Sequence, residues 1–234
     1  KKIVIIICFF FLNSCAYFEE TEEILPGKRE NVFKFEDDII LKSNERIKID
    51  KSIFVDSWSQ QYQNERNHLF HFKSKSKLSL KKKIKLNDIA FDKIDHITLP
   101  VFDLKNVYYA DNDFNIYSTN LENGKINWIV QLENEKTENL PFIGGLSLHK
   151  NELFISSGLG NIYSVNAENG KILWKKKLLV QFSRPPLVFK NKIIVVSDDN
   201  QTFALNTKDG NLMWSHVGNL EEVSIIGGSK PVVT

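Results

Sequence analysis

The sequence predicts an all-β fold built from repeated four-stranded antiparallel sheets. One motif occurs three times: a short strand, an Asn-Gly or Asp-Gly pair, and a second strand that carries Trp four residues after the Gly. The three copies span residues 115–128, 161–174 and 201–214. Their tryptophans are 46 and 40 residues apart, which matches the length of one four-stranded blade. The repeats therefore predict a β-propeller.

The Gly and the Trp of each copy have separate physical roles. An Asn-Gly or Asp-Gly pair tolerates positive φ, so each pair predicts a tight antiparallel hairpin. A Trp at a fixed place in every blade predicts a side chain that fills the space between neighbouring sheets, with its indole N–H on a backbone acceptor. We therefore expect six structural docking residues, with each Trp mostly buried: Gly124, Gly170, Gly210, Trp128, Trp174 and Trp214.

A second pair of strands precedes each motif and completes the blade. The residue 28 positions before each Trp starts an apolar strand, and these residues are Pro100, Leu146 and Pro186. The same pattern starts again at Pro231, which predicts about three blades and the beginning of a fourth. Because closed propellers typically have 4–8 blades, we expect a partial propeller from a longer protein, with about eight blades in the full ring.

The N-terminal residues resemble a bacterial lipoprotein signal. Lys1 and Lys2 precede the apolar run 3–12, which is too short to span a bilayer but has the length of a secretory signal. Leu-Asn-Ser-Cys at 12–15 then resembles a lipobox. This resemblance implies cleavage before Cys15 and a diacylglyceryl thioether on that Cys, with palmitate as an attached lipid. We therefore expect a signal peptide at 1–14, a lipidated tether at 15–57 and a partial propeller at 58–234.

Composition narrows the functional classes. The net charge is +2, and without Lys1 and Lys2 the chain has 29 basic and 29 acidic residues, so nothing favours a nucleic-acid partner. The two cysteines, Cys8 and Cys15, both lie in or at the signal. The mature chain therefore has no pair for a disulfide and must be stabilised by core packing.

The pattern Asn-x-x-x-Gly-Lys-x-x-Trp resembles the tryptophan-docking repeat of the PQQ-type β-propellers. One branch comprises BamB-type lipoproteins of the outer-membrane β-barrel assembly machinery, and another comprises quinoprotein dehydrogenases. The lipobox and the Pro-Gly-x-Arg element within 25–29 are similar to the first branch. So is the stretch before the repeats, which contains Trp58, Gln60, Asn67 and His68.

The BamB-type resemblance implies a scaffold rather than an enzyme. It implies binding to BamA, the central barrel-insertion protein, contact with unfolded outer-membrane clients, and no cofactor. Ala16, rather than Asp, after the lipidated Cys implies an outer-membrane location facing the periplasm. Two alternatives stay open: a fragment of a PQQ-dependent dehydrogenase, and a propeller that binds or senses another ligand.

The residues provide little evidence for catalysis. The sequence has no vicinal Cys pair of the quinoprotein dehydrogenase type, no Gly-rich phosphate loop and no His-Glu-x-x-His. His68 and His71 form a close pair without a zinc-like third ligand, and Asp198-Asp199 fits a turn. The lysine-rich stretch 73–85 is interpreted as a solvated strand that blocks edge pairing, with an anionic partner as the alternative. We therefore predict no catalytic, cofactor or metal residues.

A partner contact is predicted in the loop before Pro231. The resemblance implies contact through interblade loops, including an apolar Leu-x-Leu-Arg stretch. Val223, Ile225 and Ile226 match that stretch most closely, although Ile226 stands where the Arg would be. Exposed apolar clusters often mark interaction sites, but these residues fit equally well as loop anchors beneath the propeller.

Overall fold

The computed structural model describes residues 46, 48–73, 83, 98–111, 113–133, 143–219 and 230–233. Contacts divide the chain into two units, 1–47 and 48–234, and every strand of the described part lies in the second unit. No helix within these ranges has the length and apolar character needed to cross a membrane.

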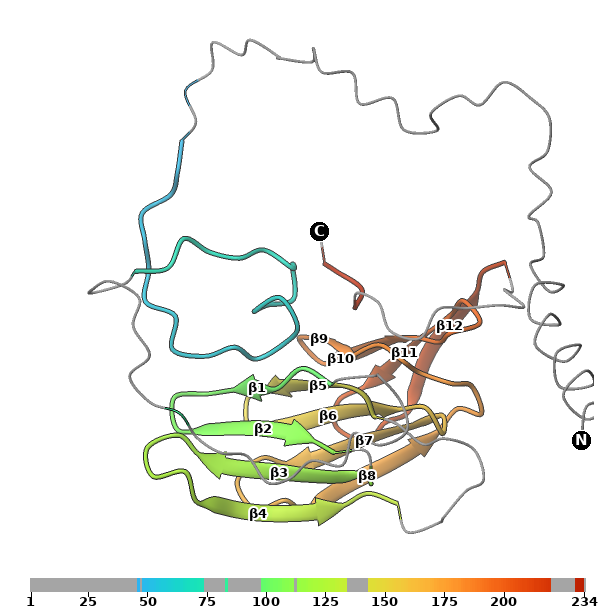
Figure 1. Cartoon of the computed structure of the whole chain (residues 1–234). Coiled ribbons are helices and arrows are strands. Elements are labelled where there is room, and N and C mark those ends of the chain that lie inside the picture. Colours follow the sequence, from blue (N-terminus) through green and yellow to red (C-terminus); the bar gives the residue numbers. More distant parts are fainter. Residues whose placement is uncertain are drawn as a thin grey trace, which may run out of the picture. The chain divides into compact units, whose positions relative to one another are not determined.

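Twelve strands of the described part form three four-stranded antiparallel sheets (Figure 1). Within each sheet the strands are paired in chain order, as in a propeller blade. The first blade contains β1 (Val101–Phe102), β2 (Asn106–Ala110), β3 (Asn115–Asn120) and β4 (Ile126–Gln131). The second contains β5 (Ile143–His149), β6 (Glu152–Ser157), β7 (Asn161–Asn166) and β8 (Ile172–Lys177). The third contains β9 (Leu187–Phe189), β10 (Lys192–Val196), β11 (Gln201–Asn206) and β12 (Leu212–Val217).

The first strand of each blade lies beside the first strand of the next. β1 contacts β5, and β5 contacts β9, so these are the inner strands, while β4, β8 and β12 are the outermost strands of their sheets. The arrangement confirms the predicted all-β propeller of four-stranded blades.

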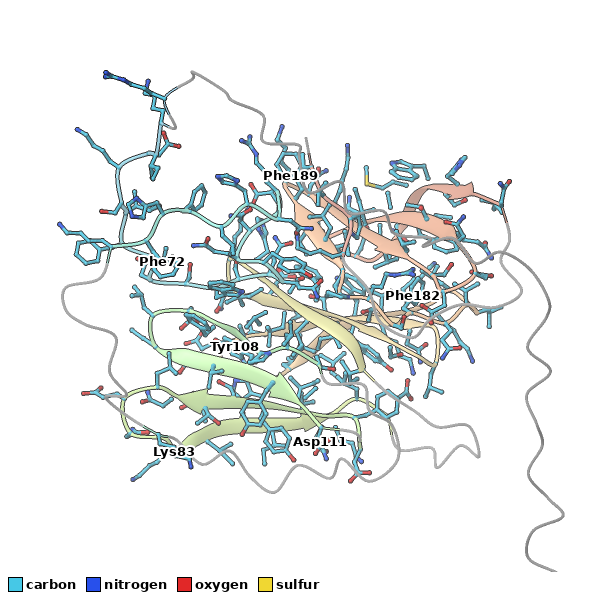
Figure 2. The ribbon with its side chains drawn as sticks, turned by 45° about the horizontal axis from the view of Figure 1, so that its top comes forward. Phe72, Lys83, Tyr108, Asp111, Phe182 and Phe189 are labelled. Carbon is cyan, nitrogen blue, oxygen red and sulfur yellow. The ribbon has the colours of Figure 1, made fainter. Side chains whose placement is uncertain are left out.

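The hydrophobic core lies between adjacent blades. Tyr108 and Ile116 of the first blade pack in one cluster with Ile155 and Tyr163 of the second. A further cluster joins the second blade to the third and contains Phe182, which is fully buried (Figure 2). Because the middle blade is covered on both faces, β6 and β7 are buried almost throughout, whereas the outermost strand β8 alternates between exposed and half-buried residues.

The predicted antiparallel hairpins at the Asn-Gly and Asp-Gly pairs are present, but the prediction that their turns are tight is wrong. Five residues separate β3 from β4, and Gly124 has φ 72° while the preceding Asn123 has no positive φ. The turn is organised from its first residue, because the side-chain oxygen of Asn120 accepts from the N–H groups of Glu122 and Asn123. An Asx turn of this kind fixes the start of the loop and so favours this longer loop over a two-residue hairpin turn.

Candidate functional site

The indole of Trp128 links the first blade to the second. Its Nε1 donates a hydrogen bond of 3.0 Å to the carbonyl of Ala167. The ring covers Gly170 so closely that a Cβ there would lie 2.8 Å from indole carbons. The Trp of one blade therefore binds the turn of the next blade, and Gly170 is needed for close approach as well as for its φ of 74°.

The same joint recurs between the second and third blades. Trp174 Nε1 donates to the carbonyl of Thr207 at 2.9 Å, and a Cβ on Gly210 would lie 2.7 Å from the indole. An aromatic ring of its own blade supports each indole, with centroids 6.1 Å apart in both the Tyr108–Trp128 and Phe154–Trp174 pairs. The interblade joint is thus a repeated unit.

Trp214 differs from the expectation that every repeat Trp is mostly buried. Its side chain is 44% exposed, whereas Trp128 and Trp174 are half-buried. The physical reason is that no further turn glycine covers its ring within the described ranges.

A short segment before the first blade, Trp58–Glu65, lies along the inner edges of successive blades; we call it the inner-edge segment. Trp58 exchanges two backbone hydrogen bonds with Phe102 of β1, at 2.8 and 3.0 Å. The next residue, Ser59, accepts from the N–H of Leu148 in β5 at 2.7 Å. Consecutive residues of the segment therefore bind consecutive blades.

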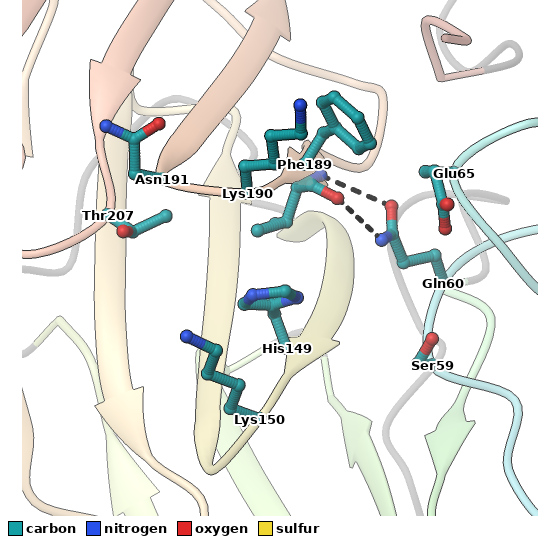
Figure 3. Close-up of a pocket in the computed structure, with 10 residues that line it drawn as sticks. Ser59, Gln60, Glu65, His149, Lys150, Phe189, Lys190, Asn191 and Thr207 are labelled. Atoms are coloured by element: carbon teal, nitrogen blue, oxygen red, sulfur yellow. Dashed lines mark hydrogen bonds between the residues drawn. The ribbon is translucent and has the colours of Figure 1, made fainter.

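Gln60 continues this pattern with its side chain. Its amide donates to the Val188 carbonyl at 2.9 Å and accepts from the Val188 N–H at 3.2 Å (Figure 3). The side chain is buried, with the residue 3% exposed, and it bonds both backbone groups of Val188 in β9 as a neighbouring strand would. Gln61 then accepts from the N–H of Lys230 at 3.1 Å. Sequence reasoning missed this role, because a Gln-Gln pair in a polar stretch gives no periodic signal.

Lys230 is a buried ammonium beside the inner-edge segment. The residue is 2% exposed, and its Nζ donates to the Asn64 carbonyl at 2.8 Å. Burial lowers the pKa of Lys230 to about 8, with the charge of Glu65 acting in the opposite direction. The charged form is therefore less stable in the folded protein than in the unfolded chain.

The lowered pKa of Lys230 predicts an unusual pH dependence of stability. Between pH of about 8 and 10.5 the unfolded chain holds a proton that the folded protein has lost, so the free energy of unfolding should rise with pH. In Lys230→Met this rise should be smaller by up to about 1 kcal/mol per pH unit. Urea unfolding of the full-length protein at pH 7, 8, 9 and 10 measures it. The exposed Lys192→Met is the control, and equal slopes in the two variants would contradict the expectation.

A polar cluster reinforces the first interblade joint. Glu133, just after β4, accepts from Asn161 at 2.6 Å and from Lys175 at 2.7 Å, and also from the Tyr163 hydroxyl. Burial raises the pKa of Glu133, but the hydrogen bonds from Lys175 and Tyr163 outweigh it, and the net pKa lies below its usual value. Burial and the hydrogen bond to Glu133 raise the pKa of Tyr163. The carboxylate thus stays charged and joins two blades.

The candidate metal ligands do not assemble into a site. His68 and His71 are both exposed, with His68 against the Phe70 ring and His71 Nδ1 3.0 Å from the Asp50 carbonyl. Asp198-Asp199 lies in a turn after β10. In the described part of the chain no group of three or more His, Cys, Asp or Glu residues could hold a metal ion.

Several predicted residues lie outside the described ranges. These are Cys15 and the rest of the N-terminal signal, the loop residues Val223, Ile225 and Ile226, and residues 74–82 and 84–85 of the lysine-rich stretch. Of that stretch, Lys73 has its Nζ 5.2 Å from the centre of the Phe54 ring, and Lys83 is exposed.

The family model described as outer membrane protein assembly factor BamB matches residues 112–234. This range is more than half of the chain. The chain belongs to the BamB family.

Other relatives of this BamB-family chain extend the comparison. An uncharacterized protein of Rickettsia conorii, RC0314, is 26% identical over 235 residues, which cover all of this chain and 50% of that protein. The chain therefore spans about half the length of this curated relative. BamB from Moraxella catarrhalis is 18% identical over 53% of this chain and 37% of its own, with a TM-score of 0.45. A europium-containing methanol dehydrogenase is 21% identical over 50% and 23%, with a TM-score of 0.43.

Proposed function

We propose that this protein is a scaffold lipoprotein of the outer-membrane β-barrel assembly machinery, which binds BamA and aids the insertion of outer-membrane proteins. The observation that carries the proposal is the match of residues 112–234 to the BamB family model. These residues include the strands β3 to β12 and both tryptophans of the interblade joints. The proposed role is that of a binding protein, without a catalytic site or cofactor.

The geometry supports a scaffold because the blades are fixed to one another while their loops are exposed. Two Trp joints, the Glu133 cluster and the inner-edge segment hold the blades in place. In the connection between β8 and β9, Leu179 is 80% exposed and has φ 61°. A rigid body that displays apolar loop residues can dock a partner by loop insertion, and exposed strand edges allow β-augmentation.

The central test is co-purification of BamA with the full-length protein from its own bacterium. We expect Ile225→Asp and Leu179→Asp each to lower the amount of BamA recovered by about tenfold, because a charge in an apolar contact leaves a desolvated group unpaired. Leu104→Asp is the matched control, since Leu104 is also exposed but lies in the β1–β2 turn rather than between blades. Each variant is first shown to melt at the wild-type temperature, so that a lower BamA recovery reflects the contact and not unfolding.

A wild-type protein that recovers no BamA would overturn this role. Undiminished BamA recovery by both loop variants would keep the partner but show that these two loops do not form the contact. Stoichiometric retention of PQQ after incubation with Ca²⁺ and desalting would instead support the dehydrogenase branch.

Lipidation at Cys15 is a separate expectation, motivated by the Leu-Asn-Ser-Cys sequence at 12–15. Several acyl chains hold a protein on a membrane far more firmly than one chain. Metabolic labelling with a tagged fatty acid should therefore mark the wild type and leave Cys15→Ala unlabelled and released from the membrane fraction. Labelling of the Cys15→Ala variant would show that the lipid is attached to another residue.

A further inference from the structure

Two short segments that precede the first blade, residues 48–54 and 69–73, are joined by their backbones (blue and teal in Figure 1). The Ile53 N–H donates to the His71 carbonyl at 2.9 Å, and the Lys73 N–H donates to the Ile53 carbonyl at 2.7 Å. A further contact of 3.0 Å joins His71 Nδ1 to the Asp50 carbonyl. The two segments therefore form one local unit that belongs to none of the three sheets. We call them the paired segments.

Exposed apolar side chains are concentrated in the paired segments. Half of their twelve residues are large apolar residues, and each of these is between 43% and 70% exposed. They are Ile49, Ile53, Phe54, Leu69, Phe70 and Phe72. Exposed apolar clusters of this kind often mark a contact surface.

The paired segments also carry a net positive charge. They contain three exposed lysines, Lys48, Lys51 and Lys73, and one carboxylate, that of Asp50. None of the three ammonium groups forms an ion pair with another described residue, and Lys73 Nζ lies 5.2 Å from the centre of the Phe54 ring. After Lys73 the sequence continues to residue 85 with six more lysines and no acidic residue. A partner that carries many negative charges is therefore favoured over a neutral one.

Exposed phenylalanines next to lysines suit the surface of an anionic lipid bilayer. Apolar side chains can enter the boundary between headgroups and acyl chains, while lysine ammonium groups stay among the headgroups. The Lys73–Phe54 contact places one side chain of each kind together. A nucleic acid or an acidic peptide would attract the lysines but would leave the apolar side chains in water.

We propose that the paired segments bind the surface of a membrane that contains anionic phospholipids. Their apolar side chains enter the interface, and Lys48, Lys51 and Lys73 contact the headgroups. This contact goes beyond the proposed binding of BamA and does not depend on it.

The test is co-sedimentation of the full-length protein with lipid vesicles in the absence of BamA. The protein is produced without residues 1–15, so that neither the signal nor an attached lipid contributes. We expect binding to vesicles of phosphatidylcholine and phosphatidylglycerol in equal parts, and at least about tenfold weaker binding to phosphatidylcholine alone, because each lysine near an anionic surface adds to the affinity. High salt should weaken the binding. Equal binding to the two kinds of vesicle, or no binding to the mixed vesicles, would overturn the proposal.

Matched variants test the apolar and the basic contributions separately. Phe72→Ser should weaken binding to the mixed vesicles by about fivefold or more, because apolar area no longer leaves water. Its control is Leu104→Ser, since Leu104 is exposed as well but lies in the β1–β2 turn. Lys51→Gln should weaken binding by about threefold or more, with Lys105→Gln of the same turn as its control.

Each variant is first shown to melt at the wild-type temperature. If Phe72→Ser binds as tightly as Leu104→Ser, the apolar side chains do not enter the membrane and the proposal is wrong.

Hydrogen exchange of the wild type locates the contact without any substitution. Addition of the mixed vesicles should slow exchange of the backbone amides in residues 48–54 and 69–73, because a membrane that covers them excludes water and restrains local opening. Exchange in the outermost strand β12 should stay unchanged. Slowing that is confined to other parts of the chain would place the membrane contact there and overturn the assignment to the paired segments.

Discussion

Replacement of Trp174 by alanine is expected to lower the free energy of unfolding of the full-length protein by about 3–5 kcal/mol, the usual cost of deleting a large aromatic side chain from a packed site. The substitution removes the ring that covers Gly210 and the partner of Phe154. It also removes the donor to the Thr207 carbonyl at 2.9 Å. One joint between two blades is thus lost as a unit.

Equilibrium denaturation measures this loss, and two further variants separate its causes. Trp174→Phe keeps an aromatic ring but loses the N–H, so it should lower the free energy of unfolding by about 1–2 kcal/mol, the scale of one lost hydrogen bond. Leu173→Ala changes an exposed neighbour on the same strand and should cost less than about 1 kcal/mol. A Trp174→Ala protein as stable as Leu173→Ala would rule out the docking role.

Gly170→Ala is expected to be nearly as damaging, although it adds only one methyl group. The residue has φ 74°, and the added carbon would lie 2.8 Å from the Trp128 ring. Strain at positive φ costs about 1–2 kcal/mol, and overpacking adds about 1–3 kcal/mol. The free energy of unfolding should therefore fall by about 2–5 kcal/mol.

A double-mutant cycle divides the two contributions. In a Trp128→Ala background the added methyl group meets no indole, so Gly170→Ala should cost only the backbone strain of about 1–2 kcal/mol. The coupling between the two sites should appear in urea titrations of the wild type, both single variants and the double variant. Additive effects within about 0.5 kcal/mol would mean that Trp128 and Gly170 do not share a contact.

The sequence predicts the blades well because their signals are local and repeated. Strand, turn and Trp recur at a fixed spacing, so each copy supports the interpretation of the others. The turn type was harder, because the Asn120 side chain and the glycine four residues later compete for control of one loop. Asn-Gly alone does not reveal which of them determines the backbone.

The inner-edge segment could not be predicted in the same way. Gln60 forms a hydrogen bond with Val188, which is 128 residues away in the sequence, and no local sequence pattern predicts such a partner. Contacts of this kind depend on how the blades are stacked, which the repeats themselves do not specify.

The inner-edge segment changes how the protein should come apart. In a linear array of repeats each unit contacts only its neighbours, so units can melt one after another from an end. Here a single stretch of eight residues is bonded to the first, second and third blades and to Lys230. Detaching any one of these three blades therefore disturbs the inner-edge segment that all three share. We expect the three blades to unfold in one cooperative transition. If the inner-edge segment is removed, the blades should instead unfold gradually, one after another.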